Sequence, residues 1–231
     1  MSKPNVSVII PALNEAANIQ VAVESAVTSG AFEIIVVDGG STDGTLEIAK
    51  SAGAKVVTSS PGRAIQQNTG AAQATGDVLL FLHADCRLAT ASIPELQSHF
   101  SGSQDHSQFG AFKQAINDRS TIYRWIEWGN NLRVRWPGLP YGDQGIWIAR
   151  ELFERGGGFA DVQLMEDVKL GERMRAHGRP ALLNGPIHVG ARRWQQSGPI
   201  RQTLRNWSIM LRYKLGVSPN DLVKSYPQHD T

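Results

Sequence analysis

The sequence has one cysteine, Cys86, and lacks any apolar run of the roughly eighteen residues that a membrane-spanning helix needs. A single cysteine excludes a framework of internal disulfide bonds and is typical of proteins of a reducing compartment. The first residues, Met-Ser-Lys-Pro-Asn, lead into an apolar segment without the hydrophobic core of a signal peptide. We therefore expect a cytoplasmic protein, at most peripheral to the inner face of a membrane.

An excess of charge of one sign is also absent. The net charge of the 231 residues is +2, which is too small to indicate nucleic acid as a bulk partner. With 41% apolar and 19% charged residues, the composition is that of an ordinary globular protein. The chain is long enough to bury a sizeable core, so we expect an ordered protein with a short tail at most.

The first hundred residues alternate apolar strands with helices. We expect strands at 6–10, 33–37, 54–58 and 78–82, with three helices between them, the first capped by Asn14. This alternation predicts right-handed crossovers and an α/β fold with a mainly parallel central sheet flanked by helices. The glycine motifs of dinucleotide folds and of P-loop proteins are missing, because the first strand runs directly into Pro11-Ala-Leu-Asn-Glu15.

Polar side chains follow the second and fourth strands. Asp38, before Gly39 and Gly40, can accept hydrogen bonds from a base or ribose, or can simply stabilise a turn before a helix. His83 and Asp85 follow the fourth strand, and in an extended segment their side chains would share a face. Such a pair can hold a divalent cation that binds a diphosphate. The alternative is a strand that becomes polar where it meets water.

Arg63 begins the helix that follows Pro61, and Gln66 lies about one turn further on. A positive charge in the first helical turn opposes the helix dipole. We therefore expect a compensating anion, such as the phosphate of a nucleotide sugar. The alternative is a solvated arginine at the edge of a loop.

The second half of the chain is less regular. Strands at 108–116 and 145–149 enclose a helix at 120–132, whose Trp125 we expect in the core. The loop at 136–145 is rich in proline and glycine around a polar centre. Some of its side chains could receive a sugar by hydrogen bonding and ring stacking. They are Trp136, Tyr141, Asp143 and Gln144.

Two charged clusters follow this loop. Glu166 and Asp167 open a helix, where acidic residues are stabilised by the helix dipole. Arg192, Arg193 and Trp194 suit a flap over a diphosphate, since guanidinium groups match the geometry of phosphate oxygens.

Three segments together are more specific than any one of them. Pro11-Ala-Leu-Asn-Glu15, Val36-Val-Asp-Gly-Gly-Ser-Thr-Asp-Gly44 and His83-Ala-Asp85, in this order, closely resemble motifs of family-2 glycosyltransferases with the GT-A fold. The resemblance extends from about Val6 to Arg193. It implies transfer of a sugar, with inversion, from a nucleoside-diphosphate donor such as a UDP- or GDP-sugar to a hydroxyl acceptor.

The resemblance also implies roles for the nucleotide-binding residues. Pro11, Asn14 and Glu15 match the first nucleotide-contacting loop of the family, and Asp38, next to Gly39, matches the carboxylate that holds the base.

On the catalytic side, the pair Glu166-Asp167 stands where the family has its catalytic base, which assigns Asp167 as the base and Glu166 as its supporting neighbour. Asp85 matches the last residue of the Asp-x-Asp metal motif, but His83 departs from that motif. This change tilts the site from Mg²⁺ towards Mn²⁺, since imidazole is a poor ligand for Mg²⁺.

The last cluster gives a narrower resemblance. Small bacterial members of the family, some linked to arsenosugar formation, look similar around Arg193-Trp194. The glutamine that precedes this element in processive members is absent, so polymer synthesis is not implied.

The same motifs predict the organisation of the chain. We expect one domain at 1–217, with a nucleotide-binding half (1–90), an acceptor and catalytic half (91–198) and an amphipathic helix (199–217), followed by a tail (218–231). The sequence has two alternative readings of its function. A nucleotidyltransferase would normally carry a glycine-rich basic loop after its first strand, and this chain does not. A non-catalytic nucleotide-sugar sensor is compatible with His83, but the intact Glu166-Asp167 pair argues against it.

The C-terminal helix carries an apolar stripe flanked by arginines. The stripe can lie on an anionic membrane and bring a lipid acceptor to the site, or it can pack on the sheet or on a second subunit in a homodimer. Its members are Ile200, Leu204, Trp207, Leu211 and Leu215, beside Arg201, Arg205 and Arg212.

Overall fold

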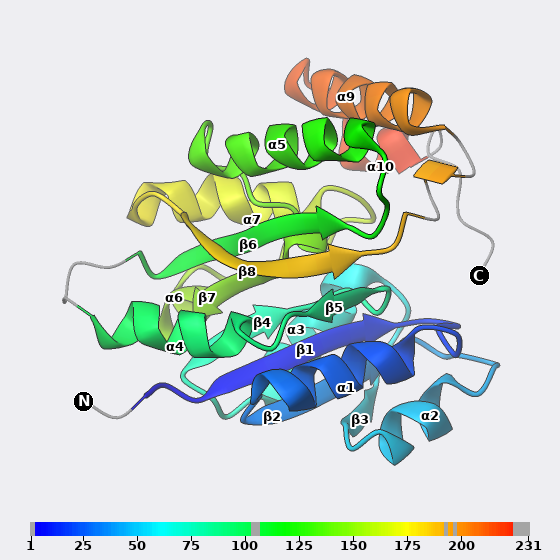
Figure 1. The fold of residues 1–231 in the computed structure, drawn as a ribbon, viewed down its shortest axis with the longest axis vertical. Coiled ribbons are helices and arrows are strands. Elements are labelled where there is room, and N and C mark those ends of the chain that lie inside the picture. The colour runs from blue at the N-terminus through cyan, green and yellow to red at the C-terminus, as the bar shows by residue number, and fades with distance from the viewer. Residues whose placement is uncertain (1–2, 103–106, 192–193, 196–197, 224–231) are drawn as a thin grey trace.

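The computed structural model describes residues 3–102, 107–191, 194–195 and 198–223. They form one eight-stranded sheet in the order β3-β2-β1-β4-β7-β6-β8-β5, with helices on both sides (Figure 1). The α/β fold expected from the sequence is confirmed.

The amino-terminal half supplies four parallel strands. They are β1 (Val6–Ala12), β2 (Glu33–Asp38), β3 (Lys55–Thr58) and β4 (Val78–Phe81), connected by α1 (Ile19–Ser29), α2 (Thr45–Ser51) and α3 (Arg63–Gln73). The central strands β1, β2 and β4 are buried almost throughout, as continuous apolar runs require. The parallel register places Ala12 opposite Asp38, so the loops after β1 and β2 emerge side by side.

The second half extends the sheet with mixed directions. β7 (Ile146–Ala149) runs antiparallel to β4 and to β6 (Phe109–Ile116), and β6 is parallel to β8 (Ala181–Val189). The short β5 (Cys86–Leu88) follows β4 in the chain but pairs with β8 at the far edge. The chain therefore crosses from the centre of the sheet to its edge just after His83 and Asp85.

Helices cover the two faces of the sheet with separate apolar cores. Because side chains alternate along a strand, Val8 and Ile10 join one core with α1, α2 and α4 (Ser92–Ser101), while Ile9 joins the other. That second core contains α3, α6 (Arg150–Arg155) and α7 (Glu166–Met174). Two short turns of 3₁₀ helix, Gly142–Gln144 and Arg175–His177, precede β7 and follow α7. The proposed division at residue 90 stays a prediction.

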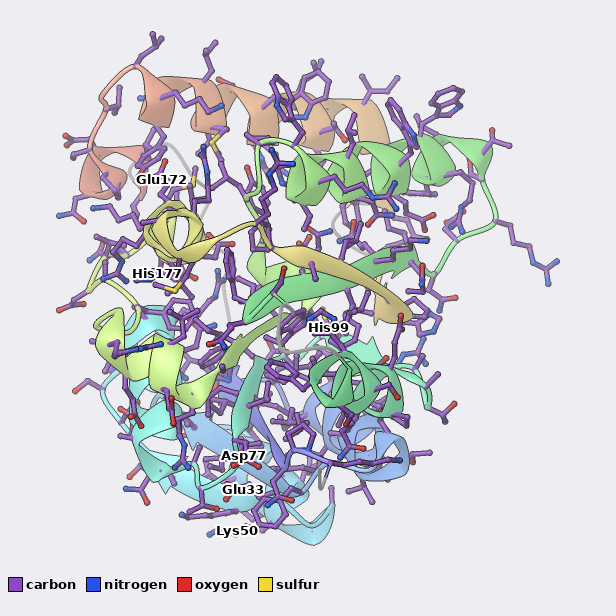
Figure 2. All side chains as sticks on the ribbon, turned by 90° about the vertical axis from the view of Figure 1, so that its left-hand side faces the viewer. Glu33, Lys50, Asp77, His99, Glu172 and His177 are labelled. Atoms are coloured by element: carbon purple, nitrogen blue, oxygen red, sulfur yellow. The ribbon has the colours of Figure 1, made fainter. Side chains whose placement is uncertain are left out.

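The C-terminal helices form an outer layer. α5 (Thr121–Arg135) lies beside the sheet, and α9 (Pro199–Lys214) packs on α5 on its far side, followed by α10 (Pro219–Val223) (Figure 1). The Tyr213 hydroxyl also donates a hydrogen bond of 2.8 Å to Glu172 of α7. Figure 2 shows Glu172 in this region, between α7 and the C-terminal helices.

One expectation about this layer is wrong, and one of the alternatives for the stripe of α9 is excluded. Trp125 is 71% exposed and not in the core, because the face of α5 that carries it points away from the sheet. The apolar stripe of α9 does not pack on the sheet either, since α9 buries Ile209 and Gln202 and leaves the stripe exposed. Among the helices of the described ranges, none is both long and apolar enough to span a bilayer.

Candidate active site

The loops after β1 and β2 are tied together by their own side chains. Asn14 has a left-handed backbone conformation (φ 52°), and its amide donates to the Ser41 hydroxyl at 2.8 Å. Its side-chain oxygen accepts the amide of Thr42 at 2.9 Å. Asn14 is therefore not the helix cap that we expected, because α1 begins only at Ile19. Instead it fixes the position of one candidate nucleotide loop against the other.

Further bonds join the same two loops. The Glu15 amide donates to the Thr45 hydroxyl at 2.8 Å, and Pro11 lies in β1 opposite Val37 of β2. The predicted nucleotide-contacting residues therefore lie together at the carboxyl ends of parallel strands, where open α/β sheets bind ligands.

Asp38 organises the loop that it begins. Its carboxylate accepts the amides of Gly40 at 2.9 Å and Ser41 at 3.0 Å, and also the Ser41 hydroxyl. The residue is 2% exposed. This is the turn that the sequence left as an alternative, so base binding by Asp38 stays a prediction.

The side chain of Gln66 links the carboxyl ends of β1 and β2, next to the candidate nucleotide loops. Its buried side-chain amide donates to the carbonyl oxygens of Ala12 at 2.7 Å and Val37 at 2.8 Å. A Cβ atom on Gly39 would lie 3.1 Å from the same nitrogen. Both of its amide hydrogens are thus engaged by the protein, which gives Gln66 a positioning role at the ends of the strands.

His83 and Asp85 lie in a turn, not in the extended segment that we expected. β4 ends at Phe81, and the Cys86 amide donates to the His83 carbonyl at 3.0 Å. The turn still gathers three side chains whose ligand atoms all lie within 4.8 Å of one another, those of His83, Asp85 and Cys86. Sequence reasoning missed Cys86, although its position next to Asp85 was a signal.

The chemistry of these donors fits a divalent cation of intermediate softness. Mg²⁺ prefers a shell made entirely of oxygen, whereas a carboxylate with an imidazole suits Mn²⁺ better. The Cys86 sulfur lies 3.6 Å from the Asp85 carboxylate and is buried in the apolar core. His83 and Asp85 are therefore the residues that could hold Mn²⁺ at this end of the sheet.

Glu166 and Arg63 join α7 to α3 across the site. α7 begins at Glu166, directly after Met165 with its left-handed backbone (φ 66°). An Arg63 guanidinium nitrogen lies 3.1 Å from a Glu166 carboxylate oxygen, and the Glu166 side chain is only 3% exposed. The anion that Arg63 requires on a first helical turn is thus supplied by the protein, so the dipole argument no longer calls for a bound phosphate.

Asp167 occupies an environment that suits a general base. One carboxylate oxygen accepts the Gly142 amide at 2.8 Å, and the other accepts the Val168 amide at 2.7 Å. Withdrawal from water raises the pKa of Asp167 to about 6, and the neighbouring Glu166 carboxylate raises it as well. A carboxylate with this pKa is ionised at neutral pH yet is more basic than an exposed aspartate.

Gly142 lies between Asp167 and the turn that carries His83. Besides donating its amide to Asp167, it lies so close to His83 that a Cβ atom would overlap the ring nitrogen Nε2. Its φ is not in the left-handed region, so the requirement for glycine here is one of space. The residues that would hold the cation and the residue that would accept the proton therefore meet at one backbone position.

Gly142→Ala should weaken Mn²⁺-enhanced nucleotide binding at least about tenfold, because the new methyl group displaces the His83 ring and neighbours of metal ligands typically matter by this factor. Titration calorimetry with UDP in Mn²⁺ measures it. Gly190→Ala is the matched control, since Gly190 is exposed and a Cβ atom there meets nothing within 4 Å. Equal affinities in both variants would contradict this role for Gly142.

The predicted sugar-binding residues of the loop before β7 differ in what their side chains contact. Gln144 is fully buried, and its side chain bonds Arg133 and the Tyr141 amide, so it stabilises the loop. One Asp143 carboxylate oxygen accepts a hydrogen bond of 2.8 Å from the side-chain amide of Gln114. The other carboxylate oxygen is buried without a hydrogen-bond partner among the described residues.

The two aromatic residues of this loop differ in their exposure to solvent. The Tyr141 ring lies 3.2 Å from the Arg133 guanidinium carbon, and burial raises the pKa of the tyrosine to about 12, which keeps the phenol protonated. Trp136 is 80% exposed at the end of α5. Sequence reasoning missed Arg133 and Gln114, which lie on α5 and β6 and hold this loop in place.

The predicted diphosphate flap is only partly described. Arg192 and Arg193 lie outside the described residues. Trp194 is 6% exposed, and its ring packs edge-on against Tyr123 of α5 at a centroid distance of 6.3 Å. Its role in the flap stays a prediction.

Residues 7–160 match the sequence family described as "Glycosyl transferase family 2". The PGL/p-HBAD biosynthesis glycosyltransferases of Mycobacterium bovis and Mycobacterium tuberculosis are 37% identical to this chain over 222 residues, covering 92% of this chain and 85% of theirs.

Solved structures share the fold at lower identity. Staphylococcus aureus TarS 1–349 in complex with UDP-GlcNAc has a TM-score of 0.64 at 20% identity, covering 80% of this chain and 58% of that one. The mannosyltransferase PcManGT from Pyrobaculum calidifontis, in complex with GDP-Man and Mn²⁺, has a TM-score of 0.62 at 22% identity, covering 82% of this chain and 57% of that one. The chain thus spans less than two thirds of either structure.

Proposed function

Since the chain belongs to glycosyltransferase family 2 and has the GT-A fold, we propose that it transfers a sugar with inversion of the anomeric configuration to a hydroxyl acceptor. That it is a glycosyltransferase using a nucleotide-sugar donor follows from the family. The proposal of inversion is supported by the environment of Asp167. Its carboxylate has a raised pKa and accepts the Gly142 amide beside the candidate nucleotide loops.

Inverting transfer needs one base and one stabilised leaving group. The acceptor oxygen attacks the anomeric carbon, the bond from that carbon to the diphosphate oxygen breaks, and the diphosphate leaves with the electron pair. The hydroxyl proton passes to the Asp167 carboxylate. Glu166 supports this role, because its negative charge helps to raise the pKa of Asp167 and so strengthens the base.

The donor occupies the other side of the site in this proposal. Pro11, Asn14, Glu15 and Asp38 border the nucleotide, and Gln66 holds the ends of their strands together. Arg63 is half-exposed, so one side of its guanidinium can meet a phosphate while it remains paired with Glu166. A divalent cation held by His83 and Asp85 would neutralise charge on the leaving diphosphate.

The identity of the donor is proposed from the relatives. TarS is in complex with UDP-GlcNAc and PcManGT with GDP-Man, so UDP- and GDP-sugars are the proposed donors. For the acceptor, two resemblances point to different molecules. Some of the small bacterial members that the chain resembles are linked to arsenosugar formation, whereas the mycobacterial relatives are named for PGL/p-HBAD biosynthesis.

A donor screen followed by analysis of the product tests the proposal. Thermal-shift measurements with UDP-, GDP- and dTDP-sugars, with and without Mn²⁺, identify the donor. Proton NMR of the product then gives its anomeric configuration, which should be opposite to that of the donor. Retention would refute inversion, and donor binding without any turnover would instead identify a nucleotide-sugar sensor.

The pH profile of kcat/KM should report the ionisation of Asp167. Only the carboxylate can accept the proton, so kcat/KM should fall about tenfold per unit below pH 6 and level off above it. Arg63→Met should move the acidic fall of kcat/KM to higher pH, because the arginine charge is one of the causes that lower the pKa of Asp167. A flat profile between pH 5 and pH 7 would exclude Asp167 as the base.

A further inference from the structure

An apolar groove lies between α5 and α9, on the outer side of the molecule, where Figure 1 shows the two helices side by side. Its volume is about 620 Å³. Large apolar side chains from both helices line it, and many of them are exposed, Trp125 by 71% and Trp207 by 66%. The principal ones are Ile122, Trp125 and Ile126 of α5 and Ile200, Leu204 and Trp207 of α9.

One end of the groove reaches the loop that carries Gly142. Its lining includes Tyr141 and Asp143, the two neighbours of Gly142, whose amide is bonded to Asp167. Asp143 brings to this end of the groove a carboxylate of which one oxygen is buried without a hydrogen-bond partner among the described residues. The apolar wall thus ends at the Asp143 carboxylate, so a molecule lying along the groove would present its terminal polar group to Asp143, next to the residue whose amide is bonded to Asp167.

We propose that this groove binds the apolar part of an amphiphilic acceptor, whose hydroxyl group reaches Asp167. The inference rests on the proposed function and names the class of acceptor. A purely polar acceptor would leave exposed apolar surface unused, and such contiguous surface on a folded protein marks a binding site. The volume is in the range of small-molecule pockets.

A membrane surface and a second copy of the chain fit the observations less well. Both would be expected to engage the most exposed end of the stripe, Leu215, which is 75% exposed but does not line the groove. A recess between two helices receives a ring or an acyl chain, whereas a bilayer surface would meet only its rims. The occupant is therefore a single amphiphilic molecule.

Alkyl β-glucosides of increasing chain length, below their micelle concentrations and without donor, test the groove by calorimetry. From hexyl to octyl glucoside, affinity should rise about threefold per methylene, since each methylene removed from water makes the free energy of binding more favourable. Methyl glucoside, with the same sugar and almost no apolar part, should show no measurable binding. An affinity independent of chain length would overturn the proposal.

Two matched variants separate the groove from the rest of the stripe. Leu204→Gln should lower octyl glucoside affinity about tenfold, while Leu215→Gln should leave it unchanged, because only Leu204 lines the groove. Both leucines are more than half exposed, so both variants should fold, as circular dichroism would verify. Equal losses in the two variants would overturn the groove in favour of a membrane-facing or dimer-forming stripe.

The donor screen keeps this test apart from the proposed function. Sugar transfer without dependence of acceptor binding on chain length overturns the groove alone. Chain-length-dependent binding without turnover of any donor overturns the proposed function, and with it the assignment of the groove to an acceptor.

Discussion

Asp167→Asn is expected to lower kcat at least about a hundredfold while leaving donor affinity nearly unchanged. Asparagine keeps the size of the side chain and can still accept the Gly142 amide through its carbonyl oxygen, but it cannot take the proton of the acceptor hydroxyl. Donor binding persists because Arg63 and Glu166 remain paired. Steady-state kinetics with saturating acceptor, together with calorimetry of donor binding, separates the two quantities.

Asp161→Asn is the matched control for this variant. Asp161 carries the same carboxyl group on an exposed loop only a few residues before α7, so the same substitution there should leave kcat unaltered. If Asp167→Asn turned over at the wild-type rate, the base would have to lie elsewhere in the chain.

Asp85→Ala is expected to abolish the enhancement of nucleotide binding by Mn²⁺. The substitution removes the one carboxylate of the three side chains that gather after β4, and a hard cation depends on that oxygen more than on nitrogen or sulfur. Titrating UDP into the protein with Mn²⁺ and with EDTA measures the effect. The wild type should bind more tightly with Mn²⁺, and Asp85→Ala should bind equally in both.

Asp77→Ala provides the comparison at the opposite end of the same strand. Asp77 precedes β4 and accepts the Asn5 amide at 2.8 Å, and Figure 2 shows it near Glu33 at the end of the sheet away from the site. Its loss should leave the Mn²⁺ effect intact. A wild-type affinity that is the same in EDTA as in Mn²⁺ would remove the metal from the proposal altogether.

The sequence predicted the amino-terminal half of the fold well, because physical signals there are local. Buried strands such as β1 and β4 are continuous apolar runs bounded by turn residues, and their helices fall between them at ordinary lengths. The order of β7, β6, β8 and β5 could not be read in this way. β5 is three residues long and pairs with a strand that comes about a hundred residues later, at Ile187–Val189.

At the site, the sequence located the residues but not their partners. Arg63 was expected to meet an anion, but that anion is a glutamate 103 residues away in the chain. Trp125 was misjudged, and the partner of the α9 stripe was left open, for a related reason. Helical periodicity shows which residues share a face, yet whether another element covers that face depends on tertiary packing.

Gly142 illustrates a further limit. Nothing in the local sequence shows that a ring from the turn after β4 presses on this position, since the contact joins residues 59 positions apart. Only the assembled loops reveal that one small residue lies between Asp167, the proposed base, and His83 of the proposed cation site.

The position of α9 bears on how this protein can diverge. The helix packs on α5 from outside, so the apolar residues of its exposed side contribute little to the sheet and its two cores. Substitutions at positions such as Leu204 and Trp207 should therefore change the binding properties of the groove more than the stability of the fold. Single substitutions in α9 could therefore change the proposed acceptor without disturbing the strands and loops of the proposed nucleotide-binding half.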